Sequence, residues 1–234
     1  MELLTLKQVA EHLRLSERTV YRLLRKGDLP GRKVGGHWRF RPSEVEYWLD
    51  VRLGRMPHAD LLELAGEWTD PSVMLSQLLD PANALIRVPA GTRQEIVTSF
   101  VHAVKFLEPV NAADLAQRVW EREELSSTAT VDGVAFVHTA RWHERALSQR
   151  GLLAVGRLEQ PTDFGALNDT LTDTLFLVLA PNDRQHLVML AEVACLCRIP
   201  GFLARLRDSS DASAVVALVQ EFERTLRGRR PASR

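Results

Sequence analysis

The 234-residue chain has 30 basic and 30 acidic side chains, and 45% of its residues are hydrophobic, which is the composition of a folded protein and excludes an intrinsically disordered one. No stretch approaches the roughly 18 apolar residues that a membrane span needs, and the N-terminal residues lack the pattern of an export signal. We therefore expect a cytoplasmic protein with one large domain or two ordinary ones.

The neutral net charge conceals an asymmetry along the chain. Residues 1–55 contain twelve Lys or Arg and seven Asp or Glu, a net charge of +5. Because the whole chain balances 30 against 30, the remaining residues have a net charge of −5. This pattern predicts a small domain that binds a polyanion, joined to a larger body of a different kind.

Two short helices are predicted near the N-terminus. Thr5 and Gln8 have the spacing of a capping box, so a helix should begin at Leu6. Ser16 should cap a second helix over residues 17–26, which Gly27 ends. Only residues 14 and 15 lie between the two, and a connection this short is typical of a helix-turn-helix.

The second helix should bury Val20, Leu23 and Leu24 and leave a basic face outward. Arginines on such a face can contact guanine edges or phosphates, and hydroxyl groups can add hydrogen bonds. The alternative is an ordinary solvated basic face. The candidate DNA-contacting residues of this helix and its cap are Ser16, Arg18, Thr19, Tyr21, Arg22 and Arg25.

A β-hairpin is predicted next, with Gly35 and Gly36 at its turn. Trp38 and Phe40 alternate toward one face, where they can pack on the helices. Pro42 and Ser43 should open a third helix, with Glu46 completing the cap and with Tyr47, Trp48 and Leu49 on an apolar face. The side chains left to face a phosphate backbone or minor groove are Arg32, Lys33, His37 and Arg39.

The stretch "LTLKQVAEHLRLSERTVYRLLRKGDLPGRKVGGHWRFRPSEVEYWL" resembles the winged helix-turn-helix domain of excisionase and MerR-type proteins. The resemblance implies that the second helix enters the major groove with Arg18, Thr19, Tyr21 and Arg22, and that the wing touches the adjoining backbone with Arg39. One such domain buries little surface, so we expect a homodimer on a two-fold DNA site.

Three further segments complete the expected organisation. Residues 56–70 are predicted to be a linker containing a short helix, which packs within the chain or pairs in a dimer. Residues 71–228 should form the larger domain, and residues 229–234 a disordered tail. Cys195 and Cys197 fall in an apolar helical stretch and should be buried thiols in a reducing compartment.

The larger domain is predicted to be α/β, a mixed sheet flanked by helices, beside the small, mostly helical N-terminal domain. Apolar strand candidates alternate with helical patterns. The strands lie within residues 83–88, 133–138, 152–158 and 174–180, and the helices span 93–107, 111–124, 183–198, 200–207 and 212–226.

Three polar residues of this domain fall at the ends of predicted elements. His138 ends a strand, His186 begins a helix, and Arg122 lies at the end of another helix. Each residue alone is typical of a surface or hydrogen-bonded group. Together they suggest a site, because α/β proteins expose their chemistry at the carboxyl ends of strands.

The segments "REELSSTATVDGVAFVHTAR" and "LAVGRLEQPTDFGALNDTLTDTLFLVLAPNDRQHLVMLAEVA" resemble the enzyme IIA domains of the fructose/mannitol class of the phosphotransferase system, including its nitrogen-regulatory members. The resemblance spans about residues 74–226. It implies that His138 accepts a phosphoryl group from a phosphocarrier protein, with His186 and Arg122 in supporting roles. Val137 stands where the family usually has proline, and the loop before the strand has fewer glycines.

The chemistry of these side chains suits that role, because a neutral imidazole is nucleophilic near pH 7 and its phosphoramidate passes the group on readily. A zinc site from His138, His143 and His186 lacks a supporting carboxylate or thiol, so we expect neither metal nor cofactor.

Three functions remain open. The first is a DNA-binding transcriptional regulator that senses phosphotransferase status through phosphorylation of His138, and is nucleoid-associated when bound. The second is a DNA-binding regulator whose body is a non-phosphorylated small-ligand sensor or dimerisation module. The third, a transport phosphotransferase component, is disfavoured because no membrane segment accompanies it. At most, the protein is an enzyme in the sense of accepting and transferring a phosphoryl group.

Overall fold

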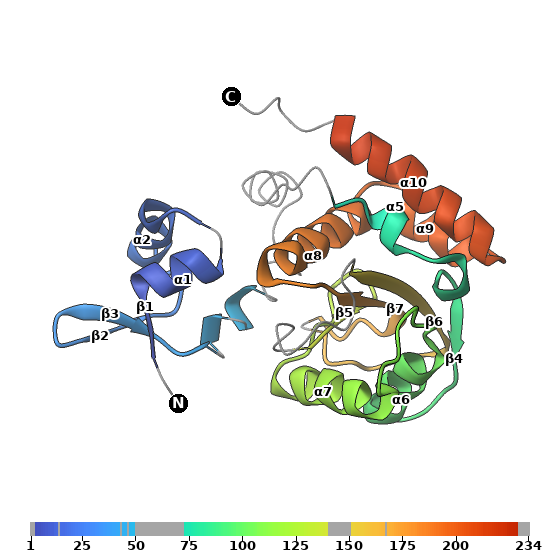
Figure 1. Ribbon diagram of the computed structural model, residues 1–234, viewed down its shortest axis with the longest axis horizontal. Coiled ribbons are helices and arrows are strands. Elements are labelled where there is room, and N and C mark those ends of the chain that lie inside the picture. Colours follow the sequence, from blue (N-terminus) through green and yellow to red (C-terminus); the bar gives the residue numbers. More distant parts are fainter. Residues whose placement is uncertain are drawn as a thin grey trace. The chain divides into compact units, whose positions relative to one another are not determined.

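The computed structural model describes residues 3–13, 15–42, 44–45, 47–49, 73–139, 151–166 and 168–228 (Figure 1). Contacts divide the chain into two compact units, Met1–Met56 and Pro57–Arg234. The predicted linker over residues 56–70 and the predicted tail over residues 229–234 lie outside the described residues.

The two N-terminal helices begin where their capping residues predict. In α1 (Leu6–His12), the Thr5 hydroxyl accepts a hydrogen bond from the Gln8 N–H at 3.2 Å, and the Gln8 side chain accepts one from the Thr5 N–H at 2.8 Å. In α2 (Glu17–Arg25), the Ser16 hydroxyl accepts from the Thr19 N–H at 3.1 Å. Gly27 follows α2 with a φ of 74°, the left-handed conformation expected after a helix.

The wing is a hairpin of β2 (Arg32–Val34) and β3 (His37–Phe40). Gly35 and Gly36 both have positive φ, 58° and 82°, as the tight turn of a two-residue hairpin requires. A third strand, β1 (Leu4–Thr5), pairs antiparallel with β3 and places Leu4 opposite Phe40. The sequence did not predict β1, because two residues are too few to show an alternating pattern.

The third helix of this unit follows the wing. Residues 42, 44–45 and 47–49 are helical, and Val45, Trp48 and Leu49 are buried. The prediction that Tyr47 shares their apolar face is wrong, since its side chain is 51% exposed. Successive helical residues point about 100° apart, so Tyr47 turns to solvent when Trp48 turns inward. The predicted cap of Ser43 and Glu46 lies outside the described residues.

The second unit is built on a four-stranded sheet in the order β4-β6-β7-β5. Strand β6 runs antiparallel to β7, whereas β4 is parallel to β6 and β5 is parallel to β7, so the sheet is mixed, as predicted. The strands are β4 (Ile86–Val88), β5 (Val134–Val137), β6 (Leu152–Thr162) and β7 (Thr172–Leu179).

Helices cover both faces of this sheet (Figure 1). One face packs on α6 and α7 around a core that includes Phe100, Val119 and Val137, and the other faces α8, with α10 packed on α8. The described helices are α5 (Leu75–Leu78), the 3₁₀ turn η1 (Pro81–Asn83), α6 (Arg93–Ala103), α7 (Ala112–Leu125), α8 (Asp183–Cys197), α9 (Phe202–Asp208) and α10 (Ala212–Gly228).

Helix α6 ends four residues before the predicted end at residue 107. The buried Asn83 side chain accepts a hydrogen bond from the Lys105 N–H at 2.7 Å and donates one to the Lys105 carbonyl at 2.9 Å. These bonds occupy the backbone groups that a continued helix would use. Helix α5 and η1 were not predicted, because such short turns leave no helical periodicity.

Cys195 and Cys197 are buried and unbridged on α8. Within the described residues, no single helix is long and apolar enough to cross a membrane, although Gln185–Cys197 and Phe202–Asp208 together satisfy length and composition across an 85° bend.

Candidate functional site

His138 follows directly after the last residue of β5. Its strand pairs with β7 as far as Val137, which lies opposite Leu177. Because strand side chains alternate between faces, His138 and Phe136 point to one side of the sheet and Val137 to the other. His138 is only 2% exposed.

His186 lies in the first turn of α8 and faces His138. The Asn182 side chain caps this helix by accepting a hydrogen bond from the Gln185 N–H at 3.0 Å. The His186 ring meets the His138 ring edge to face, with a centroid separation of 4.9 Å and an interplanar angle of 62°. His186 is also 2% exposed. The two histidines that the sequence singled out therefore form one buried pair.

Arg122 joins the pair from the last turn of α7. Its Nη1 donates a hydrogen bond to the Ser126 carbonyl at 2.9 Å, and its side chain is buried. The chain then runs back alongside β5, where Ala129 forms a bridge with Ala135. This return brings the end of α7 to the carboxyl end of β5, and the positive charge of Arg122 acts on His138.

Burial and charge keep the His138 ring neutral. Burial lowers the pKa of His138 to about 3, the Arg122 charge acts in the same direction, and the hydrogen bond to Phe136 opposes both. The His138 Nδ1 lies 2.7 Å from the Phe136 carbonyl, which can only accept, so Nδ1 bears the proton. The nucleophilic lone pair of this neutral ring is therefore on Nε2.

Glu123, the residue after Arg122, also belongs to this site and was not among the residues predicted from the sequence. Its carboxylate accepts hydrogen bonds from the Thr128 N–H, at 3.1 Å to each oxygen, and from the Thr128 hydroxyl at 2.7 Å. Burial raises the pKa of Glu123, and the Thr128 hydrogen bonds oppose that shift. In the sequence, Glu123 sits in the run "EREE", which is typical of a solvated helix end and conceals that one acid is buried.

No group of three or more His, Cys, Asp or Glu side chains that could hold a metal ion occurs within the part of the chain that the structure describes. His143, the third member of the zinc site considered from the sequence, lies outside that part.

The outer face of α2 gathers the cations predicted to contact DNA. Arg18, Tyr21, Arg22 and Arg25 are exposed, and Thr19 is half-buried. They line a shallow depression together with Lys26, a residue that was not among the predicted DNA contacts. The Ser16 hydroxyl lies 2.9 Å from the Thr19 hydroxyl and also caps the helix, so its structural role is established by these bonds.

The wing presents its charges unequally. His37 and Lys33 are exposed, and the Lys33 ammonium lies 5.4 Å from the centre of the Trp38 ring. Arg39 is half-buried and donates to the Trp38 carbonyl at 2.9 Å. Arg32, expected to face phosphates, is also exposed and forms an ion pair with Glu44 at 3.2 Å.

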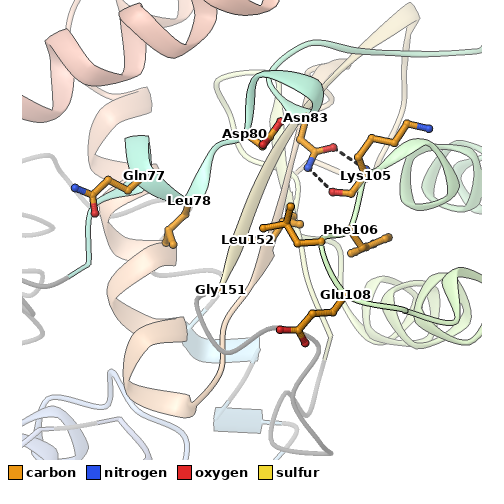
Figure 2. Close-up of a pocket in the computed structure, with 10 residues that line it drawn as sticks. Gln77, Leu78, Asp80, Asn83, Lys105, Phe106, Glu108, Gly151 and Leu152 are labelled. Carbon is orange, nitrogen blue, oxygen red and sulfur yellow. Dashed lines mark hydrogen bonds between the residues drawn. The ribbon is translucent and has the colours of Figure 1, made fainter.

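A separate cavity of about 160 Å³ opens beside the start of β6 (Figure 2). Figure 2 shows Asn83 and Lys105 joined on one of its sides, with Asp80 and Glu108 among the other lining residues. Arg122, His138 and His186 are not among its lining residues, so it is distinct from the histidine pair.

Both units match known protein families. Residues 3–51 match the family described as "Helix-turn-helix domain", and residues 77–222 match "Phosphoenolpyruvate-dependent sugar phosphotransferase system, EIIA 2". A nitrogen regulatory protein from Pseudomonas aeruginosa is 28% identical over 154 residues, covering 64% of this chain and 97% of that protein. Another from Bradyrhizobium diazoefficiens is 28% identical over 147 residues, covering 62% and 94%.

A solved structure supports the fold of the larger unit. The crystal structure of nitrogen regulatory protein IIA-Ntr from Neisseria meningitidis aligns with a TM-score of 0.55 at 21% identity, covering 62% of this chain and 97% of that one. The resemblances inferred from the sequence are thus confirmed at the level of both domains. The chain belongs to the EIIA 2 family of the phosphoenolpyruvate-dependent sugar phosphotransferase system and has a helix-turn-helix domain at its N-terminal end.

Proposed function

We propose that the protein is a DNA-binding transcriptional regulator whose EIIA domain reports phosphotransferase status through phosphorylation of His138. The observation that carries the proposal is the state of His138: a neutral ring with its proton held on Nδ1 by the Phe136 carbonyl and its lone pair on Nε2. A ring prepared in this way is a nucleophile and needs no general base.

The neighbouring side chains suit phosphoryl transfer. In the proposed step, the lone pair on Nε2 attacks phosphorus, a P–N bond forms, and the bond from phosphorus to the donor's phosphorylated histidine breaks. Arg122 is a fixed positive charge that can stabilise the negative charge spread over the phosphoryl oxygens. His186 packs against the reacting ring and limits its rotation.

The DNA-binding half of the proposal rests on the helix-turn-helix match and on the exposed cations of α2. Arg18, Arg22 and Arg25 would meet the major groove with Thr19 and Tyr21, while Lys33, His37 and Arg39 of the wing would meet the backbone. Ser16 would contribute through its cap. In the cytoplasm, a homodimer would supply two such domains to a two-fold DNA site.

A second candidate function is favoured by one observation. His138 and His186 are each only 2% exposed, so a donor protein can reach the His138 ring only if the groups that bury it move. A regulator whose body is a ligand sensor or dimerisation module would keep the same buried pair without needing that movement. The two functions share DNA binding and differ in phosphorylation.

The deciding experiment is phosphorylation of the full-length protein. The protein is incubated with phosphoenolpyruvate and the general phosphotransferase proteins of its own source, and the label is tested for acid lability. We expect one acid-labile phosphate that His138→Ala abolishes. His102→Ala is the matched control, because His102 is exposed on α6 and lies outside the site. If a carrier that labels another acceptor leaves this protein unlabelled, the second function is the correct one.

DNA binding is measured separately, with fragments of the upstream region of the gene. Phosphorylation adds about two negative charges to the EIIA domain. We expect the affinity for a specific fragment to differ between the phosphorylated and unphosphorylated proteins. An equal affinity would show that the two domains are uncoupled and would contradict the proposed sensing role.

A further inference from the structure

The segment before β5 pairs with β5 in an antiparallel arrangement. The Thr130 N–H donates to the Val134 carbonyl at 2.8 Å, and the Phe136 N–H donates to the Thr128 carbonyl at 3.4 Å. These two bonds flank the bridge between Ala129 and Ala135. In a regular antiparallel ladder, Thr128 and Phe136 would then exchange a second hydrogen bond, from the Thr128 N–H to the Phe136 carbonyl.

Glu123 replaces the Phe136 carbonyl as the acceptor for the Thr128 N–H. Among the described residues, the Thr128 N–H donates to the Glu123 carboxylate and not to the Phe136 carbonyl. The Thr128 hydroxyl donates to the same carboxylate at 2.7 Å, so the pairing is anchored at two points. Glu123 is 2% exposed, and water does not compete for these bonds.

The Phe136 carbonyl is left to serve another donor, and that donor is His138. The distance from the His138 Nδ1 to the Phe136 oxygen is 2.7 Å. Whichever ring nitrogen has a fixed acceptor bears the proton, which is how hydrogen bonding selects a histidine tautomer. The same carbonyl therefore determines which nitrogen has the lone pair.

We propose that Glu123 is a positioning residue that sets the tautomer of His138, by binding the Thr128 N–H and thereby reserving the Phe136 carbonyl for Nδ1–H. Without the carboxylate, the Thr128 N–H loses its acceptor and closes the regular ladder onto the Phe136 carbonyl. The carbonyl is then shared, Nδ1–H is held less well, and a larger fraction of the rings moves the proton to Nε2. Such a ring has its lone pair on Nδ1, on the side of the Phe136 carbonyl, and has none on Nε2 with which to attack phosphorus.

The test measures the tautomer directly, by ¹⁵N NMR of the His138 ring in full-length, unphosphorylated protein near pH 7. Wild type should show the Nδ1–H form. Glu123→Ala and Glu123→Met should each show a substantial fraction of the Nε2–H form, with the methionine filling the space and preserving the fold. Glu123→Gln retains an acceptor oxygen for Thr128 and should keep the wild-type spectrum.

Glu223→Ala is the matched control for burial. Glu223 is likewise a buried glutamate whose carboxylate accepts backbone and hydroxyl hydrogen bonds, from the Leu75 N–H at 2.6 Å and from the Ser76 hydroxyl at 2.6 Å. Its loss should reduce stability and leave the His138 tautomer unchanged. A folded Glu123→Met protein that keeps the Nδ1–H form overturns the proposal, as does a tautomer shift of equal size in Glu223→Ala.

The kinetic consequence rests on the proposed function. If His138 is phosphorylated, Glu123→Met should slow labelling about 10-fold or more, while Glu123→Gln remains within about 3-fold of wild type. The NMR experiment needs no phosphoryl donor. A protein that is never labelled would therefore refute the proposed function and still leave the tautomer assignment to be decided by its own spectrum.

Discussion

The imidazole rings of His138 and His186 meet edge to face with their centroids 4.9 Å apart, although one follows a strand and the other begins a helix much later in the chain. Both are buried, and Arg122 adds a positive charge beside them. Burial and that charge both disfavour a protonated His138. The site consequently stores a neutral nucleophile in a place where an ordinary histidine would be partly charged near pH 6.5.

The depressed pKa of His138 predicts a loss of stability in acid. Unfolded, the ring takes up a proton as pH falls through its ordinary pKa of 6.5, whereas in the folded protein it stays neutral down to about 3. Between these two pH values the unfolded state therefore binds more protons than the folded state. As the pH is lowered through this range, the free energy of unfolding decreases by about 1.4 kcal/mol per pH unit from this group.

Denaturant unfolding of wild type and His138→Gln between about pH 7 and pH 4 checks this expectation. The glutamine variant should lose less stability over the range, since it lacks the titrating group. Parallel pH profiles for the two proteins would show that His138 titrates normally in the fold.

Removal of His186 should raise the pKa of His138. His186→Ala takes away a ring that packs against His138, so water can reach the site and solvate the charged form. An NMR titration of the His138 ring should show its pKa moving from about 3 toward 6.5. In His102→Ala the titration of His138 should match wild type, and a matching titration in His186→Ala would contradict the shielding role.

Gly31 should be intolerant of any side chain. A Cβ at this position would lie 2.8 Å from the Leu24 Cδ2 and 2.8 Å from the Phe40 ring, both in the core of the helix-turn-helix unit. Gly31→Ala should therefore destabilise this unit by about 1–3 kcal/mol through overpacking and weaken DNA binding.

Gly27→Ala separates steric clash from backbone strain. Gly27 has a φ of 74°, and a Cβ added there would have nothing within 4 Å, so its substitution costs only the left-handed conformation, about 1 kcal/mol. In thermal unfolding, the helix-turn-helix unit should have a lower midpoint temperature in Gly31→Ala than in Gly27→Ala. The proposed phosphorylation of His138 should be unaffected by either, because both substitutions lie in the other unit.

Arg22→Ala should weaken DNA binding. The loss of affinity should be uniform across DNA sequences if Arg22 contacts a phosphate, and should depend on one base-pair position if it contacts a base. Arg22 is exposed on the basic face of α2. If it contacts phosphate, its loss should reduce the slope of log affinity against log salt by about 0.9; a contact to a guanine would relax specificity at one position. Titrations between about 50 and 200 mM salt distinguish the two.

Lys7→Ala provides the comparison for this substitution. Lys7 is an exposed cation of the same unit, but it lies on α1 and pairs with Glu11 at 3.9 Å. Its removal changes the net charge equally and leaves α2 intact. Equal losses of affinity in the two variants would mean that only total charge matters, against a specific role for the α2 face.

Much of the local structure could be predicted from neighbouring residues. Thr5 with Gln8 and Ser16 with Thr19 identify the starts of α1 and α2, since each cap binds a backbone N–H only three residues away. The glycine pair at the wing and the apolar run that became β7 were equally readable. The position of His138 at a strand end was also predicted, because the apolar strand pattern stops there.

What the sequence alone determined, then, are the features set by neighbouring residues: helix caps whose hydrogen bonds close within one turn, the tight turn of the wing, and the extent of an apolar strand. The tertiary structure decided the rest: that β1 pairs with β3, that Asn83 ends α6, that Arg32 pairs with Glu44, and that Glu123 frees the Phe136 carbonyl for His138. Each of these depends on which groups the folded chain brings together, through strand register, helix placement or burial, and no local pattern of residue types encodes them.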